Sequence, residues 1–234
     1  MANLVCAVIG AGPGNGAAIA RRFARDGYAV ALVARSAEFP QALAREIGDP
    51  ARAYQGDASD PSSLERAFAS IRRELGEVDV LVYNAGTGVW GTVEEIKPDA
   101  FEASWRVNAL GALVASQQVI PAMRQKRQGS IIIIGATASR KGGPKSAAFS
   151  SAKGAQRSLA ESMARHLWPV GIHVALIVID GVVDLPSTRA RMPDKPDSFF
   201  VKPDDVAATV ASVARQPRSA WSFEVEARPF GESW

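Results

Sequence analysis

Short apolar runs alternate along the chain with longer segments in which apolar residues recur every three to four positions. The runs consist mostly of Val, Ile, Leu and Ala, a pattern typical of parallel strands that are buried on both faces. The predicted strands are Leu4–Ile9, Ala29–Ala34, Arg52–Gln55, Val78–Tyr83, Ser130–Ile134, His173–Ile179 and Ser222–Val225. The predicted helices are Asn15–Asp26, Pro61–Leu75, Pro98–Met123, Ala148–Trp168 and Pro203–Arg215. This alternation predicts an α/β fold, a doubly wound and mostly seven-stranded parallel sheet with helices on both faces.

One stretch interrupts the alternation. Residues Asp184–Val201 contain three prolines and no clear period. In an open α/β sheet, a loop that leaves the carboxyl end of a strand lies over the ligand crevice. We therefore expect 184–201 to be a substrate lid, with a disordered insertion as the alternative. No linker divides the rest, so residues 1–234 are expected to form a single domain.

Composition narrows the functional classes. The chain is 47% hydrophobic and 22% charged, with a formal net charge of +3 that is too small and scattered to favour nucleic acid. No apolar run is long enough to span a membrane, and no Cys/His cluster has metal-site spacing. The single cysteine, Cys6, excludes a disulfide within the chain and favours a reducing compartment. We expect a cytoplasmic protein that acts on a small molecule.

A glycine cluster follows the first predicted strand directly and opens the first predicted helix. Its residues are Gly10, Ala11, Gly12, Pro13, Gly14, Asn15 and Gly16. Glycines at a strand–helix turn let the backbone approach a pyrophosphate, which the helix N-terminus also attracts. This context predicts a Rossmann-type dinucleotide site formed by Gly10, Gly12, Gly14, Asn15 and Gly16.

The end of the second predicted strand indicates which dinucleotide is bound. An acid there would hold the ribose hydroxyls of NAD, but the chain has Arg35 followed by Ser36. A guanidinium binds phosphate oxygens through paired, charge-assisted hydrogen bonds. The pattern therefore favours NADP over NAD, and the alternative is a solvated surface arginine.

Further motifs follow in order. Asp57 stands in Gly-Asp-Ala-Ser-Asp, Asn84-Ala85-Gly86 closes the fourth strand, Asn108 lies in Arg-Val-Asn-Ala-Leu, and Lys153 ends Phe-Ser-Ser-Ala-Lys. With the glycine spacing, these motifs resemble the short-chain dehydrogenase/reductase family over nearly the whole chain.

The resemblance implies a role for each motif. Asp57 is expected to meet the adenine ring, and Asn84, Ala85 and Gly86 to support the sheet beside the cofactor. Asn108 is expected to bend the long helix and hold a water relay, and Lys153 to bind the nicotinamide ribose. Relatives pair two long helices between subunits, which implies a homodimer or homotetramer.

Two catalytic positions depart from the family pattern. Phe149 stands where the resemblance places the proton-donating tyrosine, and Ala136 where it places the serine that polarises the substrate carbonyl. A phenyl ring has no proton to donate, and a positioned general acid contributes about 10²–10⁴-fold to a rate. Ordinary ketone reduction is therefore disfavoured.

Three hypotheses follow. The chain could reduce an activated conjugated C=C bond, with the proton coming from water or another side chain. Asp180, in Asp-Gly after the sixth strand, could instead be a substitute acid, or simply a turn residue. Finally, the chain could be a catalytically silent NADP-binding protein that acts as a sensor or assembly partner. The residues Trp90, Phe149, Leu185, Phe199 and Phe200 are candidates for an apolar substrate pocket.

Overall fold

A single seven-stranded parallel sheet forms the centre of the protein in a computed structural model, which describes residues 4–232. The strands are β1 (Val5–Ile9), β2 (Ala29–Ala34), β3 (Ala51–Gln55), β4 (Val80–Tyr83), β5 (Gly129–Ala136), β6 (Ile172–Ile179) and β9 (Glu224–Ala227). They lie in the order β3-β2-β1-β4-β5-β6-β9, with every neighbouring pair parallel. The order reverses between β1 and β4, where doubly wound sheets bind their ligands. The predicted fold class is confirmed.

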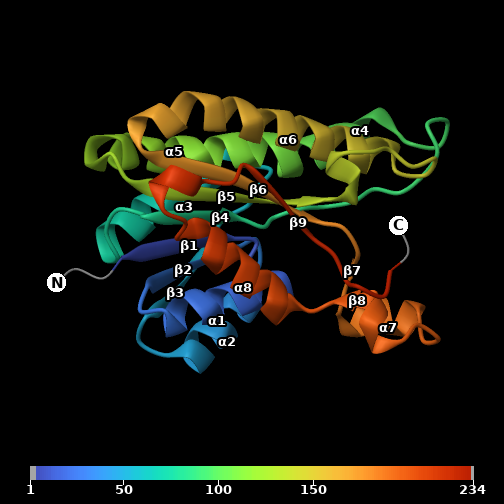
Figure 1. Cartoon of the computed structure of the whole chain (residues 1–234), viewed down its shortest axis with the longest axis horizontal. Helices are drawn as coiled ribbons and strands as arrows, with labels where there is room; N and C mark the ends of the chain where they lie inside the picture. Colours follow the sequence, from blue (N-terminus) through green and yellow to red (C-terminus); the bar gives the residue numbers. More distant parts are fainter. Residues whose placement is uncertain (1–3, 233–234) are drawn as a thin grey trace.

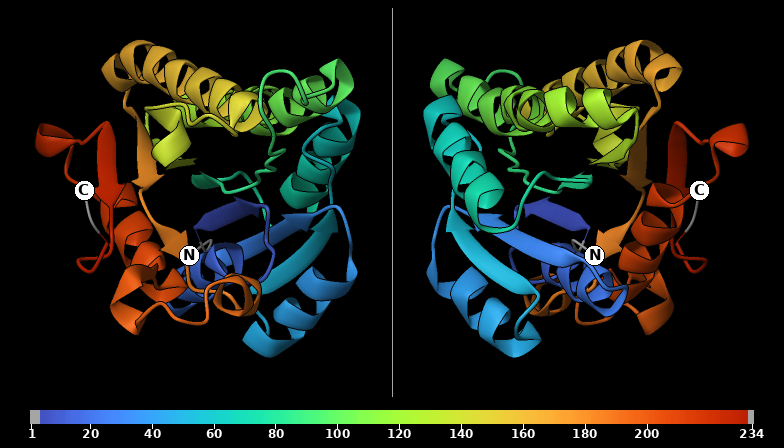
Figure 2. Two further views of the ribbon diagram at one scale, coloured as in Figure 1. Left: turned by 90° about the vertical axis from the view of Figure 1, so that its right-hand side faces the viewer. Right: turned by 90° about the vertical axis from the view of Figure 1, so that its left-hand side faces the viewer.

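Helices cover both faces of the sheet (Figures 1 and 2). One face carries α1 (Asn15–Arg25), α2 (Glu38–Ile47) and α8 (Pro203–Ala214). The other face carries α3 (Pro61–Glu74), α5 (Gly111–Lys126) and α6 (Ala147–Leu167), with α4 (Pro98–Trp105) packed on α6. This arrangement leaves the loops at the carboxyl ends of the strands free to form a site.

Each central strand contributes to two cores. In β1, Val5, Ala7 and Ile9 pack under α3, α5 and α6. The intervening Cys6 and Val8 pack against α1 and α8. Successive side chains of a strand point to opposite faces, so a strand in the middle layer must be apolar at every position. This explains the uninterrupted apolar runs in the sequence.

The long helix predicted over Pro98–Met123 is interrupted. A π-helical turn over Arg106–Leu110 separates α4 from α5. Within it, the Asn108 side-chain amide donates hydrogen bonds to the carbonyls of Ser104, at 2.8 Å, and Thr87, at 2.9 Å. A side chain that takes the carbonyl four residues back competes with the helical backbone there. The helix is therefore interrupted at Asn108, the residue that the family resemblance expects to bend it.

Two further elements differ from the sequence-based prediction. The sequence analysis predicts no helix at α2; in the structure Pro40 lies in the first turn of this helix, where a missing N–H is tolerated. The last strand was predicted over Ser222–Val225 but lies two residues later, as β9. Its predicted first residue is instead held in the preceding turn, because the Ser222 N–H donates to the Gln216 side chain at 2.8 Å.

The expected lid is a folded segment. It contains α7 (Pro186–Arg191), and the short strands β7 (Val182–Val183) and β8 (Phe200–Val201) pair at its base. The Arg189 guanidinium donates to both carboxylate oxygens of Asp184, at 2.7 and 2.8 Å, and to Asp197 at 2.6 Å. It also lies 4.0 Å from the centre of the Phe200 ring. One arginine therefore ties both ends of the segment together.

Candidate cofactor and active site

The glycine loop after β1 packs directly against the Asn-Ala-Gly turn after β4. A Cβ atom at Gly10 would lie 2.6 Å from the Ala85 nitrogen, and one at Gly16 would lie 2.3 Å from the Gly10 carbonyl oxygen. The Asn84 side-chain amide donates to that same carbonyl at 2.8 Å. The two motifs, 74 residues apart in sequence, therefore form one unit whose spacing requires glycine.

The outer part of the loop is open. A Cβ at Gly12 would meet no heavy atom of the described residues within 4 Å, its chain neighbours aside. Helix α1 begins at Asn15 with no acid in its first turn, so its positive N-terminal end is not neutralised. The Asn15 side-chain oxygen is buried and has no hydrogen-bond partner within residues 4–232. The open backbone and the start of α1 fit a bound anion. The Asn15 oxygen can only accept, so its partner would have to be a hydrogen-bond donor such as a hydroxyl.

Leu185 of the lid reaches this loop. Its Cδ2 atom lies 2.5 Å from the position that a Cβ at Gly14 would take. Gly14 has φ +93°, which also favours glycine. The segment 184–201, the expected lid, therefore contacts the loop at the start of α1.

Residues at the ends of β2 and β3 border the loop. Arg35 and Ser36 are exposed, and no ion pair engages the Arg35 guanidinium in the part of the chain that the structure describes. Asp57 accepts hydrogen bonds from the backbone and side chain of Ser59, at 2.8 and 2.7 Å, through one carboxylate oxygen. Arg35 is thus available to a phosphate.

Lys153 and Asn108 converge beside Gly86. Lys153 is only 5% exposed, and its ammonium donates to the Ile134 carbonyl and the Gln156 side-chain oxygen, each at 2.9 Å. The buried Asn108 Oδ1 has no hydrogen-bond partner among residues 4–232. A Cβ at Gly86 would lie 3.2 Å from that oxygen and 3.6 Å from the Lys153 nitrogen. The site therefore presents one unpaired acceptor and one ammonium on the side of Gly86.

Burial controls the charge of this ammonium. Removal from water lowers the pKa of Lys153 from its ordinary value of 10.5 to about 7, and no charged side chain contributes to the shift. Gln156, which the sequence analysis missed, is one of its two acceptors. The spacing in the sequence could have indicated it, because a residue three positions after Lys153 lies on the same face of the predicted helix.

The aromatic ring of Phe149 lies near the Lys153 ammonium. The Lys153 nitrogen is 5.9 Å from the centre of the Phe149 ring, and the centre of the Trp90 ring is 5.3 Å from the centre of the Phe149 ring. Phe199 and Phe200 pair separately within the lid, at 5.3 Å. The four aromatic residues of the candidate apolar set thus form two pairs, of which the Phe149–Trp90 pair is the one beside the lysine, and the fifth member, Leu185, lies against the glycine loop.

Ala136, at the position of the family's serine, and Asp180, the possible substitute acid, both take part in local hydrogen bonds. The Ala136 N–H donates to the Ser139 hydroxyl at 3.1 Å. Asp180 accepts hydrogen bonds from the Thr137 hydroxyl and from the guanidinium of Arg228, with which it forms an ion pair. Both carboxylate oxygens are thus engaged, one by the hydroxyl and the other by the guanidinium. The geometry therefore favours a structural role for Asp180 over the acid role considered above.

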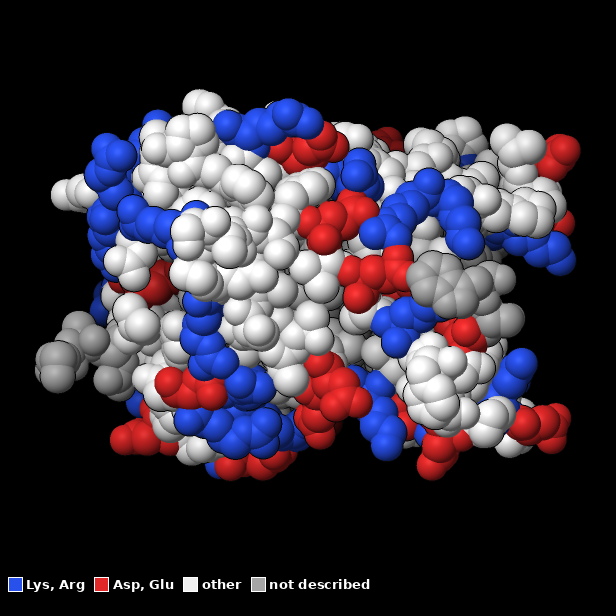
Figure 3. Space-filling model, viewed as in Figure 1, with Lys and Arg blue, Asp and Glu red and all other residues white. Residues whose placement is uncertain are grey.

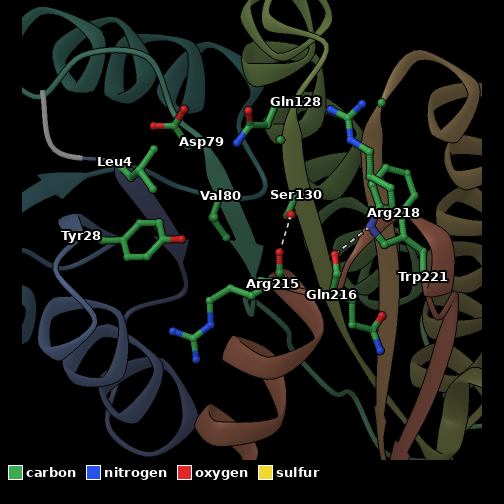
Figure 4. A pocket seen from close by; sticks show the side chains of 13 residues that line it. Leu4, Tyr28, Asp79, Val80, Gln128, Ser130, Arg215, Gln216, Arg218 and Trp221 are labelled. Carbon is green, nitrogen blue, oxygen red and sulfur yellow. Dashed lines mark hydrogen bonds between the residues drawn. The ribbon is translucent and has the colours of Figure 1, made fainter. Parts of the chain in front are cut away.

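A separate cavity of about 420 Å³ lies at the opposite edge of the sheet (Figure 4). It is lined by residues at the amino ends of the strands, including Leu4, Asp79 and Ser130, and by Arg215 and Trp221. The glycine loop and Lys153 are not among its lining residues. This cavity is therefore distinct from the candidate site.

The surface shows no continuous basic region on the face drawn in Figure 3, where acidic and basic side chains are interspersed. Residues 4–232 contain no cluster of three or more His, Cys, Asp or Glu able to hold a metal ion. None of their helices is long and apolar enough to cross a membrane.

Comparison with known proteins identifies the family. A sequence model described as short chain dehydrogenase matches residues 4–195. The chain therefore belongs to the short-chain dehydrogenase/reductase family, whose members are NAD(P)-dependent oxidoreductases.

Three similar proteins illustrate the range of relatives. The 3-oxoacyl-[acyl-carrier-protein] reductase FabG of Escherichia coli is 32% identical over 191 residues, which are 82% of this chain and 78% of that protein. Inactive 2-(S)-hydroxypropyl-CoM dehydrogenase 2 of Xanthobacter autotrophicus is 33% identical over 159 residues, covering 68% and 69%. The crystal structure of a metagenomic short-chain oxidoreductase in complex with NADP is 31% identical, covers 98% of both chains and has a TM-score of 0.84.

The contact between the glycine loop and the β4 turn can be tested with a matched pair of glycines. Gly10 and Gly27 both have φ +88°, but a Cβ at Gly27 meets nothing within 4 Å. We expect Gly27→Ala to lower the free energy of unfolding by about 1–2 kcal/mol through backbone strain. Gly10→Ala should cost a further ~1–3 kcal/mol, because Ala85 must also move. The free energies of unfolding can be measured in urea. Equal losses for Gly10→Ala and Gly27→Ala would contradict the close approach of Gly10 to Ala85.

The buried ammonium predicts a pH dependence of stability. Between pH 7 and 10.5 the lysine is protonated in the unfolded chain to a greater extent than Lys153 is in the folded protein. Protonation therefore favours the unfolded state in this range. As a result, the contribution of Lys153 to the free energy of unfolding is highest above pH 10.5 and falls as the pH is lowered to about 7. The difference in unfolding free energy between the natural protein and Lys153→Met should therefore rise with pH, by up to about 1.4 kcal/mol per pH unit. Lys141→Met, at an exposed position, is the control. A pH-independent difference for Lys153→Met would argue against the lowered pKa.

Proposed function

We propose that this chain binds NADP(H) through residues 1–234 as one domain and reduces an activated C=C bond in an apolar, carbonyl-conjugated small molecule. The observation that carries the proposal is the environment of Lys153. Its ammonium and the unpaired Asn108 oxygen meet beside Gly86, and the phenyl ring of Phe149 lies where the family resemblance places a proton-donating hydroxyl. Lys153 and Asn108 could hold a nicotinamide ribose, and Phe149 beside them has no proton to donate.

The residues present fit the cofactor. The open backbone at Gly12 and the start of α1 would hold the pyrophosphate, and Arg35 with Ser36 would hold the 2′-phosphate. Asp57, with one carboxylate oxygen outside the Ser59 hydrogen bonds, would meet the adenine. The remaining contacts would come from Gly10, Gly14, Asn15, Gly16, Asn84, Ala85, Gly86 and Lys153. The related metagenomic oxidoreductase was solved in complex with NADP, which supports this choice.

The proposed chemistry divides between the cofactor and the protein. NADPH supplies the hydride, which would add to the substrate carbon distal to the carbonyl. The Lys153 ammonium keeps one hydrogen free of the two acceptors described above and would orient the nicotinamide ribose. The Phe149 and Trp90 rings would pack on the apolar substrate.

A conjugated substrate suits this site better than a ketone. A ketone must receive a proton at its developing alkoxide during the reaction, and Phe149 offers none. In a conjugated substrate the negative charge spreads onto the enolate, whose carbon can take a proton from water. The C=C bond is reduced, and the cofactor is oxidised by the same two electrons.

A second function is supported by specific observations. The serine hydroxyls next to Phe149 are engaged, Ser150 with Ser146 at 2.7 Å and Ser151 with the Ala147 carbonyl at 2.7 Å. Asp180 is paired with Arg228. One of the relatives is named as an inactive dehydrogenase. The alternative is therefore a catalytically silent NADP-binding protein that acts as a sensor or assembly partner.

The exposed apolar residues near α4 support pairing between copies of the chain. Phe101 and Trp105 on α4 are each 41% exposed, and Trp90 and Val93 are more exposed still. Large apolar side chains that gather on one surface are typical of an interaction site. A homodimer or homotetramer assembled through this region is part of the proposal.

The cofactor assignment predicts a selective effect of Arg35→Ala. Loss of a charge-assisted contact to the 2′-phosphate should weaken NADPH binding about 10–100-fold and leave NADH binding nearly unchanged. Arg25→Ala is the matched control, because Arg25 is exposed at the opposite end of α1. The dissociation constants for NADPH and NADH can both be measured by nicotinamide fluorescence. Equal losses for the two cofactors would discard the NADP assignment.

The reaction is tested by the decay of NADPH absorbance with aldehydes, ketones and conjugated enones. We expect the natural protein to oxidise NADPH with enones and not with simple ketones. The Ala136→Ser, Phe149→Tyr double variant should gain ketone reduction, by about 10²–10⁴-fold for the restored acid. If the natural protein binds NADPH but turns over none of these substrates, the reductase proposal fails and the silent NADP-binding function is favoured.

A further inference from the structure

A buried glutamine connects the two residues that converge beside Gly86. Gln156 is 1% exposed; its side-chain nitrogen donates to the Asn108 carbonyl at 2.7 Å, and its oxygen accepts from the Lys153 ammonium at 2.9 Å. The orientation of this amide is unambiguous. An ammonium can only donate and a carbonyl can only accept, so each partner fixes one end of the side chain.

The groups around the Lys153 nitrogen are uncharged, and the Asn108 side-chain oxygen lies near it across Gly86 without a hydrogen bond to it. From β5 the Ile134 carbonyl faces it, from the turn after β4 Gly86 approaches it, and from its own helix the Phe149 ring lies 5.9 Å away. None of these groups carries a charge. The Gln156 oxygen is therefore the one side-chain acceptor that holds the ammonium among the described residues.

We propose that Gln156 is a positioning residue that sets the direction of the Lys153 ammonium at the cofactor site and stabilises its charged form by accepting a hydrogen bond. The Gln156 oxygen and the Ile134 carbonyl accept two of the three hydrogens of the ammonium. The third hydrogen then points toward Gly86. The Gln156 nitrogen, bound to the Asn108 carbonyl, keeps the Gln156 oxygen in place. This inference rests on the proposed NADP-binding function for its consequence, and on the three hydrogen-bonded groups for its geometry.

The same amide makes the connection a poor route for protons. A water or hydroxyl that bridges two groups can accept a proton on one side and release one on the other through the same oxygen. In Gln156 the acceptor and the donor are different atoms, and the donor is an amide that does not ionise near neutral pH. Gln156 thus holds Lys153 without linking it to Asn108 as a proton relay. This agrees with a proton that reaches the substrate from solvent.

Two substitutions separate this role from simple packing. Gln156→Glu replaces the neutral acceptor by a carboxylate, and Gln156→Met keeps the length of the side chain but removes both hydrogen bonds. An opposite charge at hydrogen-bond distance raises the pKa of an amine, and loss of an acceptor from a buried ammonium lowers it. We expect the Lys153 pKa to rise by at least about one unit in Gln156→Glu and to fall in Gln156→Met. A packing role alone would not move the two variants in opposite directions.

The first measurement is an NMR titration of ¹³C-labelled lysines in the cofactor-free protein, with Lys153→Met to assign the signal. Gln125→Glu and Gln125→Met, at an exposed position on α5, are the matched controls and should leave the Lys153 pKa unchanged. An unchanged Lys153 pKa in both Gln156 variants, or shifts in the same direction, would overturn the proposal. If Gln156→Met does not fold, Gln156→Glu alone decides, because a rise is expected only where the side chain faces the ammonium.

The second measurement follows NADPH affinity between pH 6 and 9. Affinity should fall as Lys153 loses its charge, and the midpoint of that fall should move upward in Gln156→Glu and downward in Gln156→Met. If the NMR shifts occur but NADPH does not bind at any pH, the proposed function fails while the positioning role of Gln156 stands. If NADPH binds with a pH profile that neither variant changes, the cofactor function stands and the positioning role is overturned.

Discussion

The backbone after β1 and the backbone after β4 approach so closely that no side chain fits between them at Gly10. This contact joins the glycine loop to the Asn-Ala-Gly turn, and the Asn84 amide fixes it by donating to the Gly10 carbonyl at 2.8 Å. The start of α1 and the region around Gly86 are positioned by the same contact. The two parts of the candidate cofactor site are thus set relative to each other by steric exclusion in the backbone, which does not depend on side-chain conformation.

The second constraint is an ammonium buried without a counter-charge. Removing a charge from water is costly, and the protein offsets the cost of burying Lys153 only with neutral acceptors. The result is a group whose pKa lies near 7, so its charge responds to what binds beside it. A bound nucleotide, which carries negative charge, would favour the ammonium form. The neutral surroundings contributed by Gln156 and Phe149 therefore make the site sensitive to occupancy.

The site separates the two halves of a carbonyl reduction. The groups that fit a dinucleotide are aligned along the carboxyl edge of the sheet. Polar side chains that follow β6 or stand next to Phe149 in the sequence are bound to other side chains, as in the pairs Asp180–Arg228 and Ser146–Ser150. Its relatives include a 3-oxoacyl reductase and a dehydrogenase named as inactive. The proposed reduction of a conjugated bond uses the hydride half and takes its proton from solvent.

The sequence by itself determined the parallel sheet, its strands and the glycine loop. These features depend on the spacing of apolar residues and on glycines at a turn, and both can be recognised within a few neighbouring residues. It also indicated Asn108 and Lys153 as site residues through the family resemblance, and the structure brings both beside Gly86. It did not reveal α2, whose proline suggests a break, or the folded lid, whose order depends on Arg189 contacting both of its ends.

Only the tertiary structure decided how the polar groups of the site are paired. Gln156 meets Asn108 across 48 residues, and Asp180 meets Arg228 across the same separation. Neither pair has a local signature, because each partner is placed by a different strand or helix. Burial decides the rest. The same lysine has an ordinary pKa in an extended chain and one near 7 once β5, α6 and the turn after β4 exclude water from it.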